Sequence, residues 1–202
     1  MRIKFVQNVI DIIRGKKKIF APSVPSSLFP TSEDKRDIIM QYANEYRCKC
    51  FVETGTYLGD TVERMKVFFD KVYSIELGKS LYENACIRFA NDSNVILHCG
   101  DSGELLKDIL PEIDEKILFW LDGHYSCGIT VKGSKNTPII KELEAISRNN
   151  QKNHIILIDD AKCFGVEEDY PTIEELRKIV LCFFPESDFR VENDIIRIIT
   201  KQ

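Results

Sequence analysis

From Lys49 onward, short apolar runs alternate with longer amphipathic runs, and this alternation constrains the fold more strongly than any other feature. Short apolar runs between turn residues predict buried strands, and amphipathic runs with helical spacing predict helices. The predicted strands are Cys50–Glu53, Lys71–Glu76, Val95–Cys99, Ile117–Asp122 and Ile155–Asp159. The predicted helices between them are Thr61–Phe69, Ser80–Ala90, Gly103–Leu110 and Pro138–Arg148. Strands that alternate with helices favour a parallel sheet covered by helices.

The C-terminal part adds a helix and two further strands to this pattern. A loop after Asp160 precedes the predicted helix Thr172–Phe184. The last two apolar runs, Phe189–Glu192 and Ile195–Thr200, are separated by Asn193-Asp194, which favours a tight turn and an antiparallel hairpin. We therefore predict an α/β fold: a Rossmann-like, doubly wound, mainly parallel seven-stranded sheet that ends in a C-terminal antiparallel β-hairpin.

Residues 1–48 form a predicted helical appendage, and residues 49–202 form the main domain. A basic amphipathic helix is expected near the start, and Ser32 or Asp34 is expected to cap a second helix that runs through Tyr46. In one interpretation both helices pack on the domain or cover its active site as a lid. In the other, the basic helix contacts an anionic membrane surface or a partner.

Charge and cysteine content limit the partners and the compartment. Residues 1–18 hold six lysine or arginine residues and one aspartate, a net +5, so a total of −4 leaves −9 on residues 19–202. This acidic body argues against nucleic-acid binding. The seven cysteines have no disulfide-framework spacing, and Cys50, Cys99 and Cys182 lie in apolar runs, as expected of buried thiols in a reducing compartment. We predict a cytoplasmic protein, with residues 1–18 as a peripheral contact to the inner membrane face; a homo-oligomer remains open.

The run Glu53-Thr54-Gly55-Thr56-Tyr57-Leu58-Gly59 follows the first predicted strand. Its two glycines let the chain turn tightly and let a ligand approach the backbone. Asp60 or Thr61 is expected to cap the next helix, whose free N–H groups favour an anionic group. The pattern differs from the Gly-x-Gly-x-x-Gly dinucleotide fingerprint.

Polar residues also end the second and third predicted strands. Glu76 lies 23 residues after Glu53, about the spacing at which an acid holds ribose hydroxyls. Asp101 and Ser102 follow the third strand, where they could meet the edge of a base; a turn with a helix cap is the competing interpretation. Because ligands of open α/β sheets bind outside the carboxyl ends of the strands, these features predict one nucleotide-like site.

In the order of these motifs, the run from Phe51 to about Phe164 resembles the class I S-adenosylmethionine-dependent methyltransferases, and among them the small O-methyltransferases. The resemblance implies that the glycine loop holds the methionine part of the cofactor, Glu76 the ribose, and Asp101 with Ser102 the adenine. The cofactor-binding residues expected on this basis are Glu53, Gly55, Thr56, Tyr57, Gly59, Thr61, Glu76, Asp101, Ser102 and Asp122. A nicotinamide enzyme is the alternative, which the terminal hairpin and the lack of room for a second domain disfavour.

Acidic residues also follow the fourth and fifth predicted strands: Asp122, then Asp159 and Asp160. If these strands are neighbours, three hard oxygen ligands converge, which suits Mg²⁺ or another divalent cation. The cation would lower the pKa of an acceptor hydroxyl, and His124 could take its proton. The arrangement resembles metal-dependent O-methyltransferases, including those that act on natural-product sugars, although small catechol-type enzymes commonly have Asp-Asn where this chain has Asp-Asp. Alternatively, Asp122 contacts the cofactor amine or orients the histidine, and the pair only caps a loop.

The loop from residue 127 to residue 137 contains lysines that suit an acceptor with a phosphate or carboxylate. The sequence therefore predicts an S-adenosylmethionine-dependent O-methyltransferase that acts on a hydroxyl of a saccharide or glycan precursor, with help from a divalent metal. Catalysis is assigned to His124 and Asp122. The alternatives are a metal-independent methyltransferase that uses these two residues, and a catalytically inactive scaffold subunit that binds S-adenosylmethionine.

Overall fold

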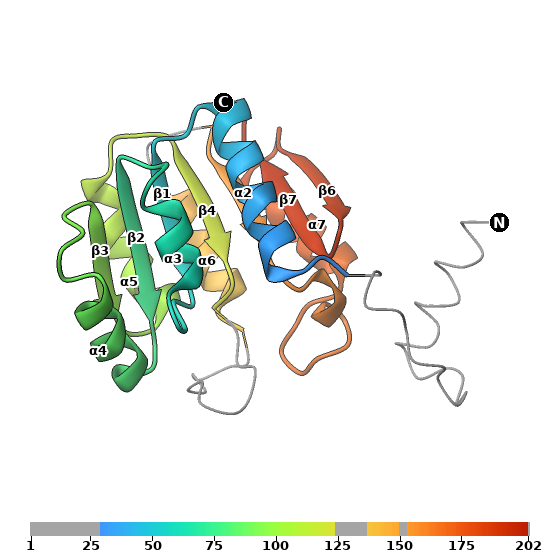
Figure 1. Cartoon of the computed structure of the whole chain (residues 1–202). Coiled ribbons are helices and arrows are strands. Elements are labelled where there is room, and N and C mark those ends of the chain that lie inside the picture. The colour runs from blue at the N-terminus through green and yellow to red at the C-terminus, as the bar shows by residue number, and fades with distance from the viewer. Residues whose placement is uncertain (1–28, 124–136, 150–152, 202) are drawn as a thin grey trace.

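The computed structural model describes residues 29–123, 137–149 and 153–201, which form a seven-stranded sheet flanked by helices (Figure 1). The strand order is β3-β2-β1-β4-β5-β7-β6. The first five strands are parallel, and β7 lies antiparallel between β5 and β6. The predicted sheet and its C-terminal hairpin are therefore confirmed. The strands are β1 (Cys50–Thr54), β2 (Lys71–Glu76), β3 (Val95–Cys99), β4 (Ile117–Leu121), β5 (Ile155–Ile158), β6 (Asp188–Glu192) and β7 (Ile195–Ile199).

Helices cover both faces of the sheet. In Figure 1, α2 and α3 lie in front of the strands, and α5, α6 and α7 lie behind them. The helices are α2 (Ser32–Tyr46), α3 (Asp60–Met65), α4 (Lys79–Arg88), α5 (Ser102–Ile109), α6 (Ile139–Ser147) and α7 (Ile173–Phe183), with short 3₁₀ turns at Leu110–Glu112 and Ala161–Cys163. No helix within the described ranges is both long and apolar enough to cross a membrane.

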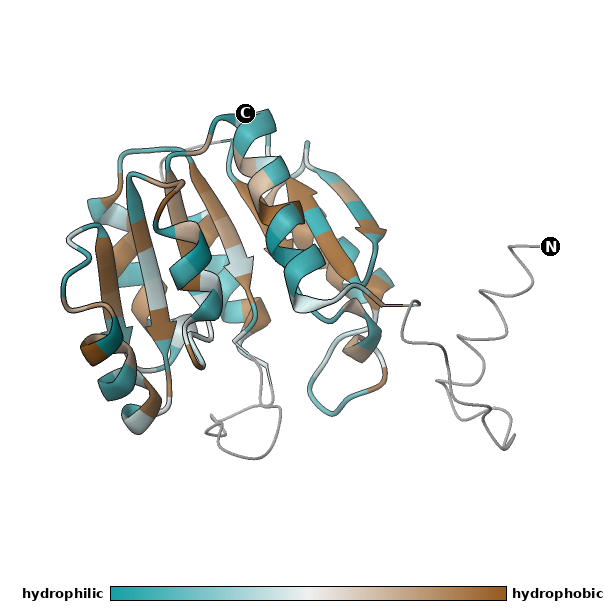
Figure 2. Ribbon diagram, in the orientation of Figure 1, coloured by the Kyte–Doolittle hydropathy of each residue, from teal (hydrophilic) through white to brown (hydrophobic). Residues whose placement is uncertain are grey.

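Alternate residues of each central strand enter two separate cores. In β4, Phe119 packs with the α5–α6–α7 side, whereas Leu118 and Trp120 pack with the α2–α3–α4 side. β4 is buried along its whole length and is mostly brown in Figure 2, as expected of a strand covered on both faces. Each such aliphatic or aromatic side chain contributes about 1.5–3 kcal/mol when it is buried. Two large cores therefore hold the strand ends in fixed positions.

Residues 29–48 of the predicted appendage pack on the sheet through α2. Ile39 is fully buried in the same core as Phe51. The N-cap of α2 is Thr31, so the prediction of Ser32 or Asp34 as the cap is wrong. Thr31 Oγ1 accepts a hydrogen bond from the Asp34 N–H, and the Asp34 carboxylate accepts one from the Thr31 N–H. Residues 1–28, with the predicted basic helix, lie outside the described residues.

Two further expectations need correction. The helix predicted over Thr61–Phe69 ends at Met65, where the chain turns to place Phe69 in the core. Cys50 is buried as expected, but Cys99 and Cys182 are exposed. Cys99 ends the edge strand β3, and Cys182 lies on the outer side of α7, so apolar neighbours in sequence did not imply burial.

Candidate cofactor and acceptor site

The candidate site lies where the strand order reverses. β1 pairs with β2 on one side and with β4 on the other, so the chains that leave β1 and β4 turn toward opposite faces. This topological switch point is where open α/β sheets bind ligands. Thr54 is in register with Leu121, which brings Gly55 and Asp122 to the same edge of the sheet.

Both glycines of the loop after β1 are required, because each has a positive φ and leaves no room for a Cβ. Gly55 has φ +86°, and a Cβ there would lie 2.5 Å from the Asp122 carbonyl oxygen. Gly59 has φ +83°, and a Cβ there would lie 2.8 Å from the Phe89 ring. Gly59 is itself the N-cap of α3, so the prediction of Asp60 or Thr61 as the cap is wrong. The left-handed conformation that starts the helix at this point favours glycine.

Glu76 fastens the glycine loop to the end of β2. One carboxylate oxygen accepts from the Tyr57 N–H at 2.8 Å, and the other accepts from the Gly78 N–H at 2.8 Å. A carboxylate can accept about four hydrogen bonds, so both oxygens retain lone pairs for further donors such as ribose hydroxyls. The buried Glu76 therefore both shapes the loop and offers acceptors at its predicted position.

Glu53 lies beneath the loop in a buried polar network. Ser74 Oγ donates to Glu53 Oε2 at 2.8 Å and lies 2.6 Å from Thr56 Oγ1. Burial raises the pKa of Glu53 to about 8, the charges of Asp122 and Glu76 add to the increase, and hydrogen bonds from the side chains of Ser74 and Thr61 oppose it. The carboxyl is therefore close to its titration point at neutral pH, and a positive charge nearby would ionise it.

Asp101 and Ser102 have structural partners of their own. Asp101 is the N-cap of α5 and accepts from the Gly103 N–H at 2.9 Å, as the competing interpretation expected. Ser102 Oγ donates to Glu142 Oε1 at 2.6 Å. Glu142 was not predicted as a site residue, although it lies on the apolar face of α6 with Leu143. Burial raises its pKa to about 7, against hydrogen bonds from Ser102 and Thr54.

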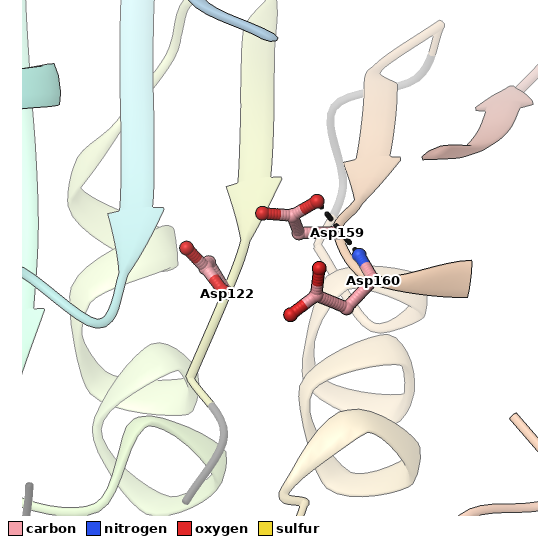
Figure 3. Close-up of side chains that lie close together, drawn as sticks. All are labelled: Asp122, Asp159 and Asp160. Atoms are coloured by element: carbon pink, nitrogen blue, oxygen red, sulfur yellow. Dashed lines mark hydrogen bonds between the residues drawn. The ribbon is translucent and has the colours of Figure 1, made fainter. Parts of the chain in front are cut away.

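Asp122, Asp159 and Asp160, here called the acidic cluster, lie side by side at the ends of β4 and β5 (Figure 3). One carboxylate oxygen from each lies within 4.8 Å of the others. The backbone N–H groups of Asp122 and Asp159 continue the sheet by bonding to Thr54 O and Leu121 O. Burial, followed by the charges of Asp122 and Asp160, raises the pKa of Asp159 to about 7. The predicted convergence is therefore present; His124 lies outside the described residues.

Two lysines that the sequence analysis did not single out contact the acidic cluster. Lys35 Nζ, from α2, lies 2.6 Å from Asp159 Oδ1 and 3.1 Å from Asp160 Oδ1. Lys162 Nζ lies 2.6 Å from Asp160 Oδ1 and 2.8 Å from Asp194 Oδ2. No local pattern could have revealed the first contact, because 125 residues separate Lys35 from Asp160.

The donor chemistry of the acidic cluster fits a hard divalent cation. Three carboxylates converge from two neighbouring strands, and carboxylate oxygens are the ligands that Mg²⁺ prefers. The cluster already contacts the ammonium groups of Lys35 and Lys162, which neutralise part of its charge. A cation would therefore be held by Asp122, Asp159 and Asp160 in competition with these lysines.

The fold of this chain is similar to the folds of solved methyltransferases. An O-methyltransferase from Bacillus cereus in complex with S-adenosylhomocysteine matches with a TM-score of 0.61 at 12% identity, over 96% of this chain and 90% of that chain. A putative caffeoyl-CoA O-methyltransferase from Staphylococcus aureus matches with 0.59 at 14%, over 98% and 97%. CalS10, an amino pentose methyltransferase from Micromonospora echinaspora, matches with 0.55 at 13%, over 83% and 91%. No protein-family model and no curated protein matches the sequence.

Proposed function

We propose that the chain is an S-adenosylmethionine-dependent O-methyltransferase. The observation that carries the proposal is the set of buried carboxyls at the switch point: Glu53, Glu76 and Glu142 lie around the glycine loop and the end of β1. S-adenosylmethionine carries a positive sulfonium centre and a ribose, which match buried acids and the Glu76 acceptors. A dinucleotide would bring a doubly negative pyrophosphate to the same carboxyls, which would disfavour its binding.

We propose a hydroxyl of a saccharide or glycan precursor as the acceptor. The match to an amino pentose methyltransferase and the predicted lysine loop support this class. His124, two residues after Asp122, would take the hydroxyl proton, and Asp122 would orient or stabilise the resulting imidazolium. A divalent cation held by the acidic cluster would lower the pKa of the acceptor hydroxyl. The oxygen would then form a bond to the sulfonium methyl as the S–CH₃ bond breaks and S-adenosylhomocysteine leaves, a transfer for which this chain would supply mainly positioning.

A metal-independent methyltransferase is the second candidate, and the contact of Lys35 with Asp159 favours it because a cation is already present. In either case we propose a cytoplasmic location, with residues 1–18 in peripheral contact with anionic lipid. A scaffold subunit that binds the cofactor without catalysis would share the cofactor site but not the transfer reaction.

Calorimetry with S-adenosylmethionine, S-adenosylhomocysteine and NAD tests the shared premise. We expect binding of the first two and not of NAD; the absence of any binding at millimolar S-adenosylmethionine would contradict the proposal. Transfer of a labelled methyl group to a panel of sugar phosphates and nucleotide sugars, with and without EDTA, then separates the alternatives. Full turnover in EDTA would exclude the metal-dependent mechanism. Cofactor binding without methyl transfer would favour the scaffold subunit.

A further inference from the structure

Lys35 joins the helix α2 to the acidic cluster at the carboxyl end of β5. Its ammonium contacts Asp159 and Asp160, and its side chain is only 16% exposed. Lys162 differs from it, because Lys162 also pairs with Asp194 outside the cluster. Within the described residues, both ion pairs of Lys35 are with the acidic cluster.

We infer that Lys35 is the resident cation at Asp159 of the acidic cluster, and that a divalent cation binds this carboxylate only in competition with it. The inference rests on the proposed function in one respect, namely that the cluster is the metal site of the acceptor side. It goes further by assigning to a residue of α2 the control of metal affinity.

The geometry at Asp159 Oδ1 makes the competition direct. This oxygen accepts from the Asp160 N–H at 2.7 Å and lies 2.6 Å from the Lys35 ammonium. Mg²⁺ binds carboxylate oxygens at about 2.0–2.1 Å, so a metal ion on the same oxygen would lie within a few ångströms of the ammonium. Two cations that close, in a partly buried site, repel strongly. Lys35 must therefore withdraw before the ion takes this oxygen.

Withdrawal needs only a movement of the lysine side chain. α2 is anchored by the fully buried Ile39 and by Tyr42, so the helix itself stays on the sheet. The four-carbon stem of lysine is flexible and can carry the ammonium toward solvent. With Lys35 in place, the like charges of Asp159 and Asp160 are compensated in the metal-free protein.

The test compares Lys35→Met with Lys66→Met in the full-length protein. Lys66, the C-cap residue of α3, is a matched control, because its side chain is 17% exposed and pairs with Glu63 and Asp92, each at 2.9 Å, away from the cluster. Mn²⁺ titration, followed by electron paramagnetic resonance, is expected to show binding at least about tenfold tighter in Lys35→Met and unchanged in Lys66→Met. Equal or weaker binding by Lys35→Met, or no binding by any of the three proteins, overturns the inference.

A second measurement needs no variant. Reductive methylation with formaldehyde, read by mass spectrometry, should modify Lys35 slowly in metal-free wild type and faster once Mn²⁺ is bound, while Lys66 does not change. Unchanged reactivity of Lys35 in the Mn²⁺-bound protein overturns the inference. S-adenosylhomocysteine calorimetry on the same samples separates the two failures: retained cofactor binding with no gain in Mn²⁺ affinity refutes the role of Lys35 alone, and lost cofactor binding refutes the proposed function.

Discussion

The Ser102 hydroxyl donates a 2.6 Å hydrogen bond to the buried Glu142 carboxyl, and this bond joins the first turn of α5 to α6. Thr54, at the end of β1, also hydrogen-bonds to Glu142. One carboxyl therefore connects three elements that meet at the switch point. It fixes the direction in which α5 leaves the third strand, and with it the position of Asp101.

Replacing Glu142 tests this connection. Glu142→Leu leaves the Ser102 hydroxyl without its acceptor, and a buried donor that loses its partner costs about 1–3 kcal/mol of unfolding free energy. Glu142→Gln keeps an acceptor oxygen on an uncharged side chain, so its loss of unfolding free energy at pH 6 should be much smaller. Urea unfolding measures both variants. The double variant Ser102→Ala/Glu142→Leu should recover part of the loss; equal stability of the leucine and glutamine variants would contradict the role.

Glu76→Gln should weaken cofactor binding more than it weakens the fold. The glutamine offers one oxygen and one NH₂ group where Tyr57 and Gly78 each present a backbone N–H, so one N–H faces a donor. The loop then loses one anchor, and the proposed acceptor for ribose is lost with it. We expect S-adenosylhomocysteine affinity to fall by at least about tenfold, or about 1.4 kcal/mol, in calorimetry. Glu83→Gln, on the exposed side of α4, is the control that should bind normally.

The sheet and the acidic strand ends could be predicted from the sequence, because both follow from local periodicity and from the rule that parallel strands end at one edge. Asp122 and Asp159 are examples: each directly follows a strand that is buried on both faces. Lys35 could not be predicted, because its contact depends on the core in which α2 packs against β5. Glu142 could have been predicted, since a carboxyl on the apolar stripe that includes Leu143 indicates a buried polar partner.

Gly55→Ala should damage both stability and the site. The alanine Cβ would lie 2.5 Å from the Asp122 carbonyl oxygen, and φ +86° is unfavourable for a residue with a side chain. β1 and β4 must then separate at the edge that carries the acidic cluster. We expect the unfolding free energy to fall by at least about 2 kcal/mol, together with weaker S-adenosylhomocysteine binding. Gly78→Ala is the control, because φ −78° suits alanine. A Gly55→Ala protein with normal stability would show that the loop adapts without strain.

Stability should fall as the pH rises through neutrality, and Glu53 should contribute to the fall. Its pKa is raised from 4.5 to about 8 in the folded protein, so between these values the folded state binds more protons than the unfolded state. By linkage, the stabilisation is complete below about pH 4.5 and is lost as the pH passes through about 8, with a slope of up to about 1.4 kcal/mol per pH unit for one proton.

Glu53→Gln mimics the protonated carboxyl and should flatten this part of the curve in urea unfolding from pH 5 to pH 9, whereas the exposed Glu186→Gln should not. Saturating S-adenosylmethionine should flatten the wild-type curve further than neutral S-adenosylhomocysteine does, because the sulfonium charge favours the ionised carboxyl. Equal curves with the two ligands would place the sulfonium away from Glu53.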